Sequence, residues 1–219
     1  MYIKEIWRYP VKSMAGQSID RSSVGALGLA GDRMIHIRDT RGRVVTARTY
    51  PKLLGHKATL GIQGEPLVDG RPWSAPEVLA DVQVIAGSGA RLVRDETDQR
   101  FDVLPLLVAT DGAIAAFGRD GRRLRPNIVI GGVDGLAERT WEGGLLRIGN
   151  VRIFVHSLRG RCVMTTFDPD TLEHDPEVLL DIVHRFDGRL ALNCAAEVEG
   201  VIQVGQQVEI VLPETPSFE

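Results

Sequence analysis

The chain has 219 residues, of which 43% are hydrophobic and 25% are charged, and its formal net charge is −3. This is the balance of a folded globular protein, and it provides no global basic field for nucleic acid or an anionic membrane. The two cysteines, Cys162 and Cys194, are too few for a disulfide scaffold, and no apolar run reaches the roughly 18 residues of a membrane span. We therefore expect a cytoplasmic protein that binds neither nucleic acid nor membranes.

Short apolar stretches rich in β-branched residues and separated by Gly, Pro and Asp predict a mostly β protein, a barrel or a sandwich. The expected strands are residues 2–9, 34–38, 44–46, 57–62, 82–86, 127–130, 145–148, 151–156 and 208–212. Residues 39–42, with the sequence DTRG, predict a hairpin turn, and Gly149 with Asn150 predicts another tight turn.

Two segments have the pattern of helices. Residues 111–117 are small and apolar and follow Thr110, a suitable N-terminal cap. Residues 176–186 place apolar side chains at helical spacing after Asp175, with Pro176 at the first position. The composition changes over residues 69–81, where Pro72 and Pro76 occur. We therefore expect an N-terminal domain at 1–80, a second domain at 81–213 and a tail at 214–219.

Two N-terminal segments could bind an anion. In YPVKS at residues 9–13, Lys12 and Ser13 supply an ammonium and a hydroxyl where the chain leaves a strand; the alternative is a solvated loop lysine. In GLAGDR at residues 28–33, glycine permits close approach of a ligand and Arg33 enters an apolar strand, where a charge needs a partner. The alternative is a surface turn formed by Asp32 and Arg33.

Two further segments are rich in arginine. Thr46 and Arg48 share one face of the strand that we expect there, unless this strand is only an exposed edge. In RRLRPN at residues 122–127, three arginines precede an apolar strand and make a candidate anion site, unless the turn is simply solvated.

Cys162 lies beside Arg161 in the segment RCVMTT at residues 161–166. A thiol next to a guanidinium can react as a thiolate or ligate a soft metal, although a lone cysteine is often only a small buried apolar residue. The five histidines lack the spacing of zinc ligands, so we expect them to be structural: His36, His56, His156, His174 and His184.

Taken in order, these segments resemble the molybdenum cofactor sulfurase C-terminal (MOSC) family with its N-terminal β-barrel companion. The resemblance runs from about residue 2 to residue 211, and PLLVATD at 105–111 and ERTW at 138–141 add to it. It implies a mostly β (α+β) fold, in which an N-terminal β-barrel-like domain packs on a C-terminal MOSC β-barrel with a few helices. The relatives that it points to are the amidoxime-reducing components.

The resemblance also implies a site for the molybdenum cofactor, a pterin (molybdopterin) that carries a phosphate and a metal-binding dithiolene. The residue matching Cys162 ligates the metal in such relatives and is the catalytic residue. The residues matching the following positions hold or line the cofactor: Lys12, Ser13, Arg33, Thr110, Asp111, Arg125 and Asn127. On electrostatic grounds we add Arg48 and Arg161.

The implied activity is reduction of N-hydroxylated or N-oxide small molecules, with electrons from a separate protein of the ferredoxin, flavin reductase or cytochrome b5 type. One departure from the family pattern is Arg159, which stands where relatives often have a second cysteine and would alter which substrates fit, favouring an anionic one. Two alternatives stay open: a sulfur carrier with a persulfide on Cys162, and a non-catalytic module that binds an anion or the cofactor.

Overall fold

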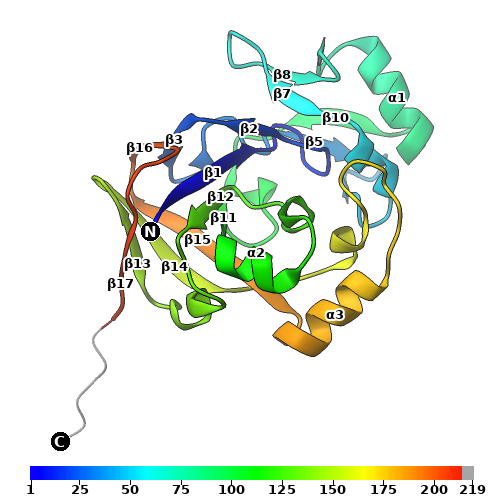
Figure 1. The fold of residues 1–219 in the computed structure, drawn as a ribbon. Coiled ribbons are helices and arrows are strands. Elements are labelled where there is room, and N and C mark those ends of the chain that lie inside the picture. Colours follow the sequence, from blue (N-terminus) through cyan, green and yellow to red (C-terminus); the bar gives the residue numbers. More distant parts are fainter. Residues whose placement is uncertain (214–219) are drawn as a thin grey trace, which may run out of the picture.

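The computed structural model describes residues 1–213, and within them strands predominate over three α-helices (Figure 1). The mostly β prediction is confirmed. The strands are β1 (Tyr2–Arg8), β2 (Gln17–Ile19), β3 (Arg21–Gly25), β4 (Gly28–Leu29), β5 (Ile35–Arg38), β6 (Val44–Val45), β7 (Ala58–Leu60), β8 (Pro66–Val68), β9 (Arg71–Pro72), β10 (Arg91–Arg94), β11 (Leu106–Thr110), β12 (Ile128–Gly131), β13 (Leu145–Ile148), β14 (Val151–Gly160), β15 (Arg189–Val198), β16 (Gly200–Gln203) and β17 (Glu209–Val211). The helices are α1 (Pro76–Ala86), α2 (Asp111–Phe117) and α3 (Glu177–Phe186).

The largest sheet has eight strands in the order β17-β13-β14-β15-β11-β12-β1-β2. Only β11 and β12 are parallel to each other in this sheet; the other neighbours are antiparallel. The sheet curls round so that its two ends meet. Backbone hydrogen bonds join Ile3 to Gln206 and Gly205, and Val208 to Met1, just before the chain enters β17. This closure leaves few unpaired strand edges, which is the advantage of a barrel.

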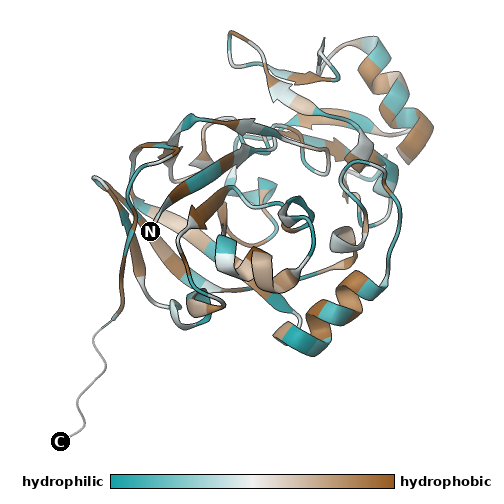
Figure 2. Ribbon diagram, viewed as in Figure 1, coloured by the Kyte–Doolittle hydropathy of each residue, from teal (hydrophilic) through white to brown (hydrophobic). Residues whose placement is uncertain are grey.

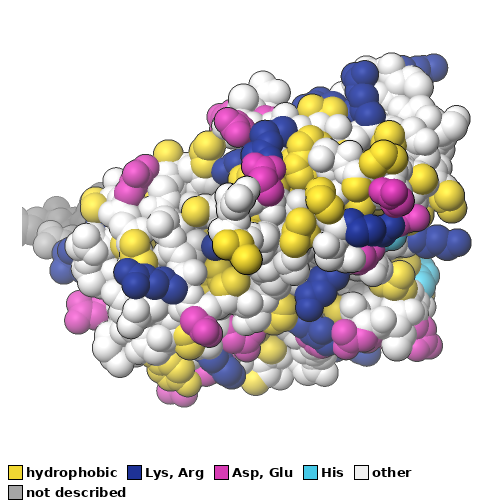
Figure 3. Space-filling model, turned by 90° about the horizontal axis from the view of Figure 1, so that it is seen from above, with side chains coloured by type: hydrophobic (Ala, Val, Ile, Leu, Met, Phe, Trp, Pro, Cys, Tyr) yellow, Lys and Arg dark blue, Asp and Glu magenta, His cyan; other side chains and the backbone are white. Residues whose placement is uncertain are grey.

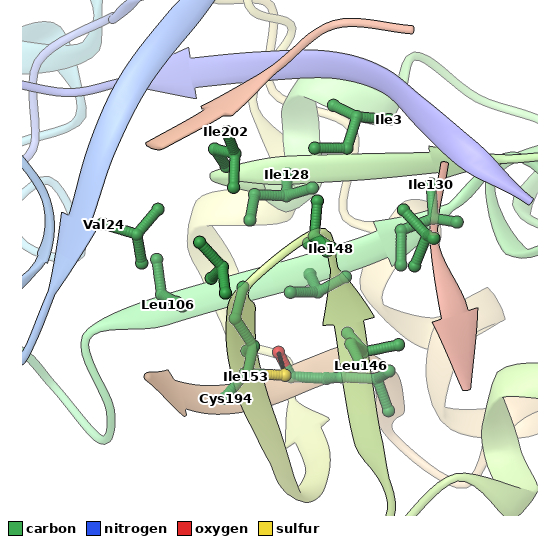
Figure 4. Packing of buried hydrophobic residues seen from close by; sticks show 14 of the residues in the cluster. Ile3, Val24, Leu106, Ile128, Ile130, Leu146, Ile148, Ile153, Cys194 and Ile202 are labelled. Carbon is green, nitrogen blue, oxygen red and sulfur yellow. Dashed lines mark hydrogen bonds between the residues drawn. The ribbon is translucent and has the colours of Figure 1, made fainter. Parts of the chain in front are cut away.

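The interior of this barrel is a continuous apolar core. Figure 4 shows Ile3, Ile128, Ile148 and Ile202 pointing into the same space from different strands. Cys194 on β15 lies in this core with no exposed surface, and burial raises the pKa of its thiol. Cys194 is therefore the small apolar type of cysteine, in contrast to Cys162, which is only partly buried.

A second core lies in the lobe at the top of Figure 1, which contains β5, β7, β8, β10 and α1. The prediction of a strand at 82–86 was wrong, because those residues form the last turns of α1. Val78 and Val82 are fully buried four residues apart, whereas Val84 is 87% exposed, which is a helical rather than an alternating pattern. Pro76 at the first position starts the helix.

The two predicted helices and both predicted turns are confirmed. The Thr110 side chain accepts a hydrogen bond from Ala113 at the start of α2, and Asp175 accepts one from Glu177 at the start of α3. Around α3, polar and apolar residues share the surface (Figure 2), because the helix buries one face, built from Val178, Ile182 and Phe186, against α2 and its neighbours.

The turns at residues 39–42 and 149–150 connect β5 to β6 and β13 to β14 as antiparallel hairpins. The two cores, however, do not separate at a single point along the chain. β1 and β2 belong to the eight-stranded sheet, and β3 pairs with β16 near the other end of the chain. The division at residue 80 stays a prediction about domains.

The face shown in Figure 3 carries basic and acidic side chains interspersed, without a continuous field of one sign. None of the helices in residues 1–213 has the length and apolar character needed to span a bilayer. Positively charged side chains are instead concentrated in a pocket.

Candidate anion and metal site

Most of the predicted site residues converge on one pocket. Both halves of the chain contribute to it: the segment after β1, the turn after β6, the segment before β11, the segment before β12 and the end of β14. The predicted residues that line it are Lys12, Ser13, Arg33, Arg48, Arg125, Asn127, Arg161 and Cys162. With Arg123 and Arg159, the lining has seven cationic side chains, while Asp102 is the one carboxylate among the described lining residues.

Cys162 lies in the wall of this pocket on a fixed piece of backbone. It follows β14 and caps a short 3₁₀ turn, and its carbonyl accepts hydrogen bonds from the backbone and the hydroxyl of Thr165, at 3.0 and 2.9 Å. Arg48 lines the same pocket. Burial lowers the pKa of Arg48, but the neighbouring Cys162 thiol and the Asp102 carboxylate outweigh this effect and raise the pKa. A partly exposed sulfur beside a cation can react or ligate a metal as the thiolate.

Lys12 and Ser13 are held where the chain passes β5. The Lys12 amide donates to Ile35, and the ammonium donates to the carbonyl of Arg100 at 3.0 Å. The Ser13 hydroxyl accepts a hydrogen bond from the Ala47 amide at 3.0 Å, and this leaves its proton free for another acceptor. The alternative of a solvated loop lysine is wrong, because Lys12 is only 9% exposed.

Asp102 neutralises part of the positive charge. It is 2.8 Å from the Lys12 ammonium, it pairs with Arg48, and it lies 3.6 Å from Arg159. Burial alone would raise the pKa of Asp102, but the hydrogen bond from Lys12 and the three positive charges lower it to about 2. The carboxylate is therefore ionised at neutral pH.

Arg33 and Arg125 lie over the ring of Tyr9, at 5.1 and 4.3 Å from its centre. Arg33 also pairs with Asp32, which is fully buried and accepts a hydrogen bond from the Tyr9 amide, so the alternative of a surface turn is wrong. The same Arg33 nitrogen donates to Asn127 at 3.3 Å. The Tyr9 ring thus contacts two of the guanidinium groups that line the pocket.

Three of these residues have left-handed backbone conformations, with φ of 72° at Ser13, 51° at Arg33 and 56° at Arg125. Such conformations cost side-chain-bearing residues on the order of 1–3 kcal/mol each and tend to cluster at functional sites. Their occurrence around one pocket indicates that the fold orders this region for a purpose other than packing.

Arg125 and Arg161 carry charge without a carboxylate partner. Burial lowers the pKa of each to about 10, with neighbouring charges as smaller contributions. Arg125 donates to the carbonyl of Met14 at 2.8 Å and Arg161 to that of Leu124 at 2.7 Å. The Nε and Nη1 atoms of Arg161 are buried, and no residue among 1–213 accepts a hydrogen bond from them. Buried donors without acceptors are costly, so this part of the pocket is suited to a ligand that provides oxygen acceptors.

Thr110 and Asp111 do not lie in this pocket. β11 borders the pocket at Leu106 and Leu107, and Thr110 and Asp111 follow roughly 10–15 Å farther along at the usual rise of a strand. There the Thr110 hydroxyl donates to the buried Glu138, and the Asp111 carboxylate accepts from the amides of Gly132 and Val133. Both residues therefore have structural contacts at the start of α2, and their part in a cofactor site stays a prediction.

Sequence reasoning missed Asp102 and Tyr9. Asp102 lies in an irregular segment before β11 with no local pattern to single it out. Tyr9 is the first residue of the segment at 9–13, but only the structure shows the two arginines over its ring. The shared strand face of Thr46 and Arg48 was also wrong, because β6 ends at Val45; both residues nevertheless line the pocket, from the turn that follows.

Comparison with known protein families gives two matches. Residues 1–73 match the MOSC N-terminal beta barrel domain, and residues 114–209 match the MOSC domain. Lys12, Ser13 and Arg33 fall in the first match and Cys162 in the second, so the pocket is built from both.

Among characterised proteins, the chain is 26% identical over 242 residues to mitochondrial amidoxime reducing component 2 of Macaca fascicularis, covering 84% of this chain and 72% of the relative. It is 24% identical over 229 residues to mitochondrial amidoxime-reducing component 1 of Homo sapiens, covering 77% of this chain and 67% of the relative. Among solved structures, the YuaD protein of Bacillus subtilis matches with a TM-score of 0.52 at 13% identity over 95% of this chain and 94% of that one, a similarity of fold.

Proposed function

Because the chain belongs to the MOSC family, we propose that it binds the molybdenum cofactor in the cationic pocket, with Cys162 as the protein ligand of the metal. The observation that carries this proposal is the Arg161 guanidinium, whose buried Nε and Nη1 lack acceptors close to a partly exposed thiol. A ligand with a phosphate at one end and a soft metal at the other matches both features.

The residues divide into two groups in this proposal. Lys12, Ser13 and Arg33 would hold the phosphate and the polar edge of the pterin. Arg125, Asn127 and Arg161 line the same pocket and would supply further donors. Arg48 would lie at the metal end, because it lines the pocket near Cys162, whose thiol raises the pKa of Arg48.

We further propose that the protein is an oxidoreductase that reduces N-hydroxylated or N-oxide compounds. The names of its relatives support the first of these classes, because amidoximes are N-hydroxylated. The bound cofactor supplies the two-electron chemistry. The protein would position it between the cationic side chains and Cys162, which line the same pocket. In this proposal the electrons come from a separate protein.

The test is the metal content of the protein produced in a host that makes the cofactor. We expect about one molybdenum per chain by analogy with a single thiolate ligand, and its loss in Cys162→Ser. Cys194→Ala is the matched control, because Cys194 is buried in the barrel core away from the pocket. Full molybdenum content in Cys162→Ser would refute the proposed ligand.

The sulfur-carrier alternative uses the same thiol but has no need of the cationic pocket behind it. It predicts that the intact mass rises by about one sulfur atom after treatment with a cysteine desulfurase and that a reductant removes the addition. The cluster of guanidinium groups at the pocket floor favours the cofactor.

A further inference from the structure

We propose that Arg159 binds an anionic group of the substrate beside Cys162, and that it thereby makes the protein selective for negatively charged substrates. The inference rests on the proposed function for the reaction, but the binding of the anion does not itself depend on the metal.

The position of Arg159 is fixed by the strands around it. It lies near the end of β14, three residues before Cys162, and both residues line the pocket. Its Nη1 donates to the Asn193 side chain at 3.2 Å, and Asn193 in turn donates to Ser157 at 3.1 Å. The side chain is 20% exposed, so the guanidinium is anchored on the pocket wall yet open to a ligand.

Arg159 is the least satisfied of the cations that share Asp102. The carboxylate is 2.8 Å from Lys12 and hydrogen-bonds to Arg48, whereas the Nη2 atom of Arg159 is 3.6 Å away, beyond hydrogen-bond length. Nη2 therefore keeps its donors free. A guanidinium with a free edge can form a forked pair with a carboxylate or another oxyanion.

The surrounding charge also favours an anion. Burial lowers the pKa of Arg159, and the charges of Arg33 and Arg48 lower it further, against Asp102 and Cys162, which raise it. A negatively charged substrate group would relieve this repulsion between cations, which a neutral group would leave in place. Asp102 competes with a bound anion, because its carboxylate attracts the same guanidinium group of Arg159.

Binding of benzoate and benzamide to the protein as purified tests the proposal, because the two probes share a ring and differ in charge. We expect calorimetry to show benzoate binding about tenfold more tightly, the size of one charged hydrogen bond. Arg159→Gln should abolish the difference, Arg159→Lys should keep part of it, and Asp102→Asn should widen it. Arg43→Gln is the control, because Arg43 is exposed in the hairpin after β5 and pairs with Asp39.

A parallel measurement uses the cofactor-loaded enzyme with benzamidoxime and 4-carboxybenzamidoxime, for which Arg159→Gln should raise KM for the carboxylated compound alone. Equal binding of benzoate and benzamide, or unchanged benzoate binding in a folded Arg159→Gln variant, would overturn the inference. Protein without molybdenum that still prefers benzoate through Arg159 would refute the proposed function but support this inference. Protein that contains molybdenum but binds benzoate and benzamide equally would support the proposed function and refute this inference.

Discussion

Replacing Arg161 by methionine should make the cofactor-free protein more stable. Methionine keeps an unbranched side chain of similar length and removes the charge, so packing along the stem is largely retained. At neutral pH Arg161 is charged in both the folded and the unfolded chain. Any penalty for burying that charge is therefore present in full in the wild-type protein.

The size of the gain follows from the pKa of Arg161, which burial lowers from 12.5 to about 10. This corresponds to a penalty of about 3 kcal/mol for the charged form. The hydrogen bond from Nη2 to the Leu124 carbonyl stabilises the folded protein by about 1.5 kcal/mol, and the variant loses it. We therefore expect Arg161→Met to raise the free energy of unfolding by about 1–2 kcal/mol.

Arg123→Met provides the matched control, because Arg123 is also nearly buried but is paired. It donates to the Thr165 carbonyl and to Asp168 at 3.0 Å, so its loss removes two hydrogen bonds, one of them part of an ion pair. This variant should lose about 1–2 kcal/mol of stability.

Urea titrations of both variants beside the wild type measure these changes in the free energy of unfolding. If Arg161→Met is less stable than the wild type by as much as Arg123→Met, Arg161 is a structural residue. Its unpaired donors then do not indicate a binding site for a ligand.

Three further predictions concern the fold around the site. Thr110→Val should cost about 1–2 kcal/mol by removing the cap of α2, and should leave the molybdenum content unchanged; loss of the metal would restore Thr110 to the cofactor site. Ile128→Ala should cost about 2–5 kcal/mol in urea unfolding, since Ile128 is fully buried in the barrel core, and a loss below 1 kcal/mol would contradict that packing. Burial and the Lys12 charge lower the pKa of the fully buried His36 to about 4. The unfolded chain takes up a proton near pH 6.5 and the folded one only near pH 4, so this residue should reduce stability by up to about 3 kcal/mol as the pH falls through that window. His36→Leu should abolish that part of the pH dependence, and an unchanged slope would show that His36 does not titrate as a buried neutral side chain.

Local patterns in the sequence determined most of the strands, the hairpin turns and two of the three helices. They succeeded where the chemistry is local, as in the cap at Thr110 and the proline before α3. They failed at residues 82–86, where β-branched side chains favour a strand but Pro76 and the burial of Val78 and Val82 give a helix. Propensity is a weak influence, and tertiary packing overrode it there.

The identity of the candidate site was also largely determined by the sequence, since the ordered motifs around Lys12, Arg33, Arg125 and Cys162 converge on one pocket. What only the tertiary structure decided is the balance of charge within that pocket. Asp102 forms an ion pair with Lys12, a residue 90 positions away in the chain. Within residues 1–213, the buried Nε and Nη1 donors of Arg161 have no acceptor. Burial and distance set the strength of each charge, and a linear sequence contains neither.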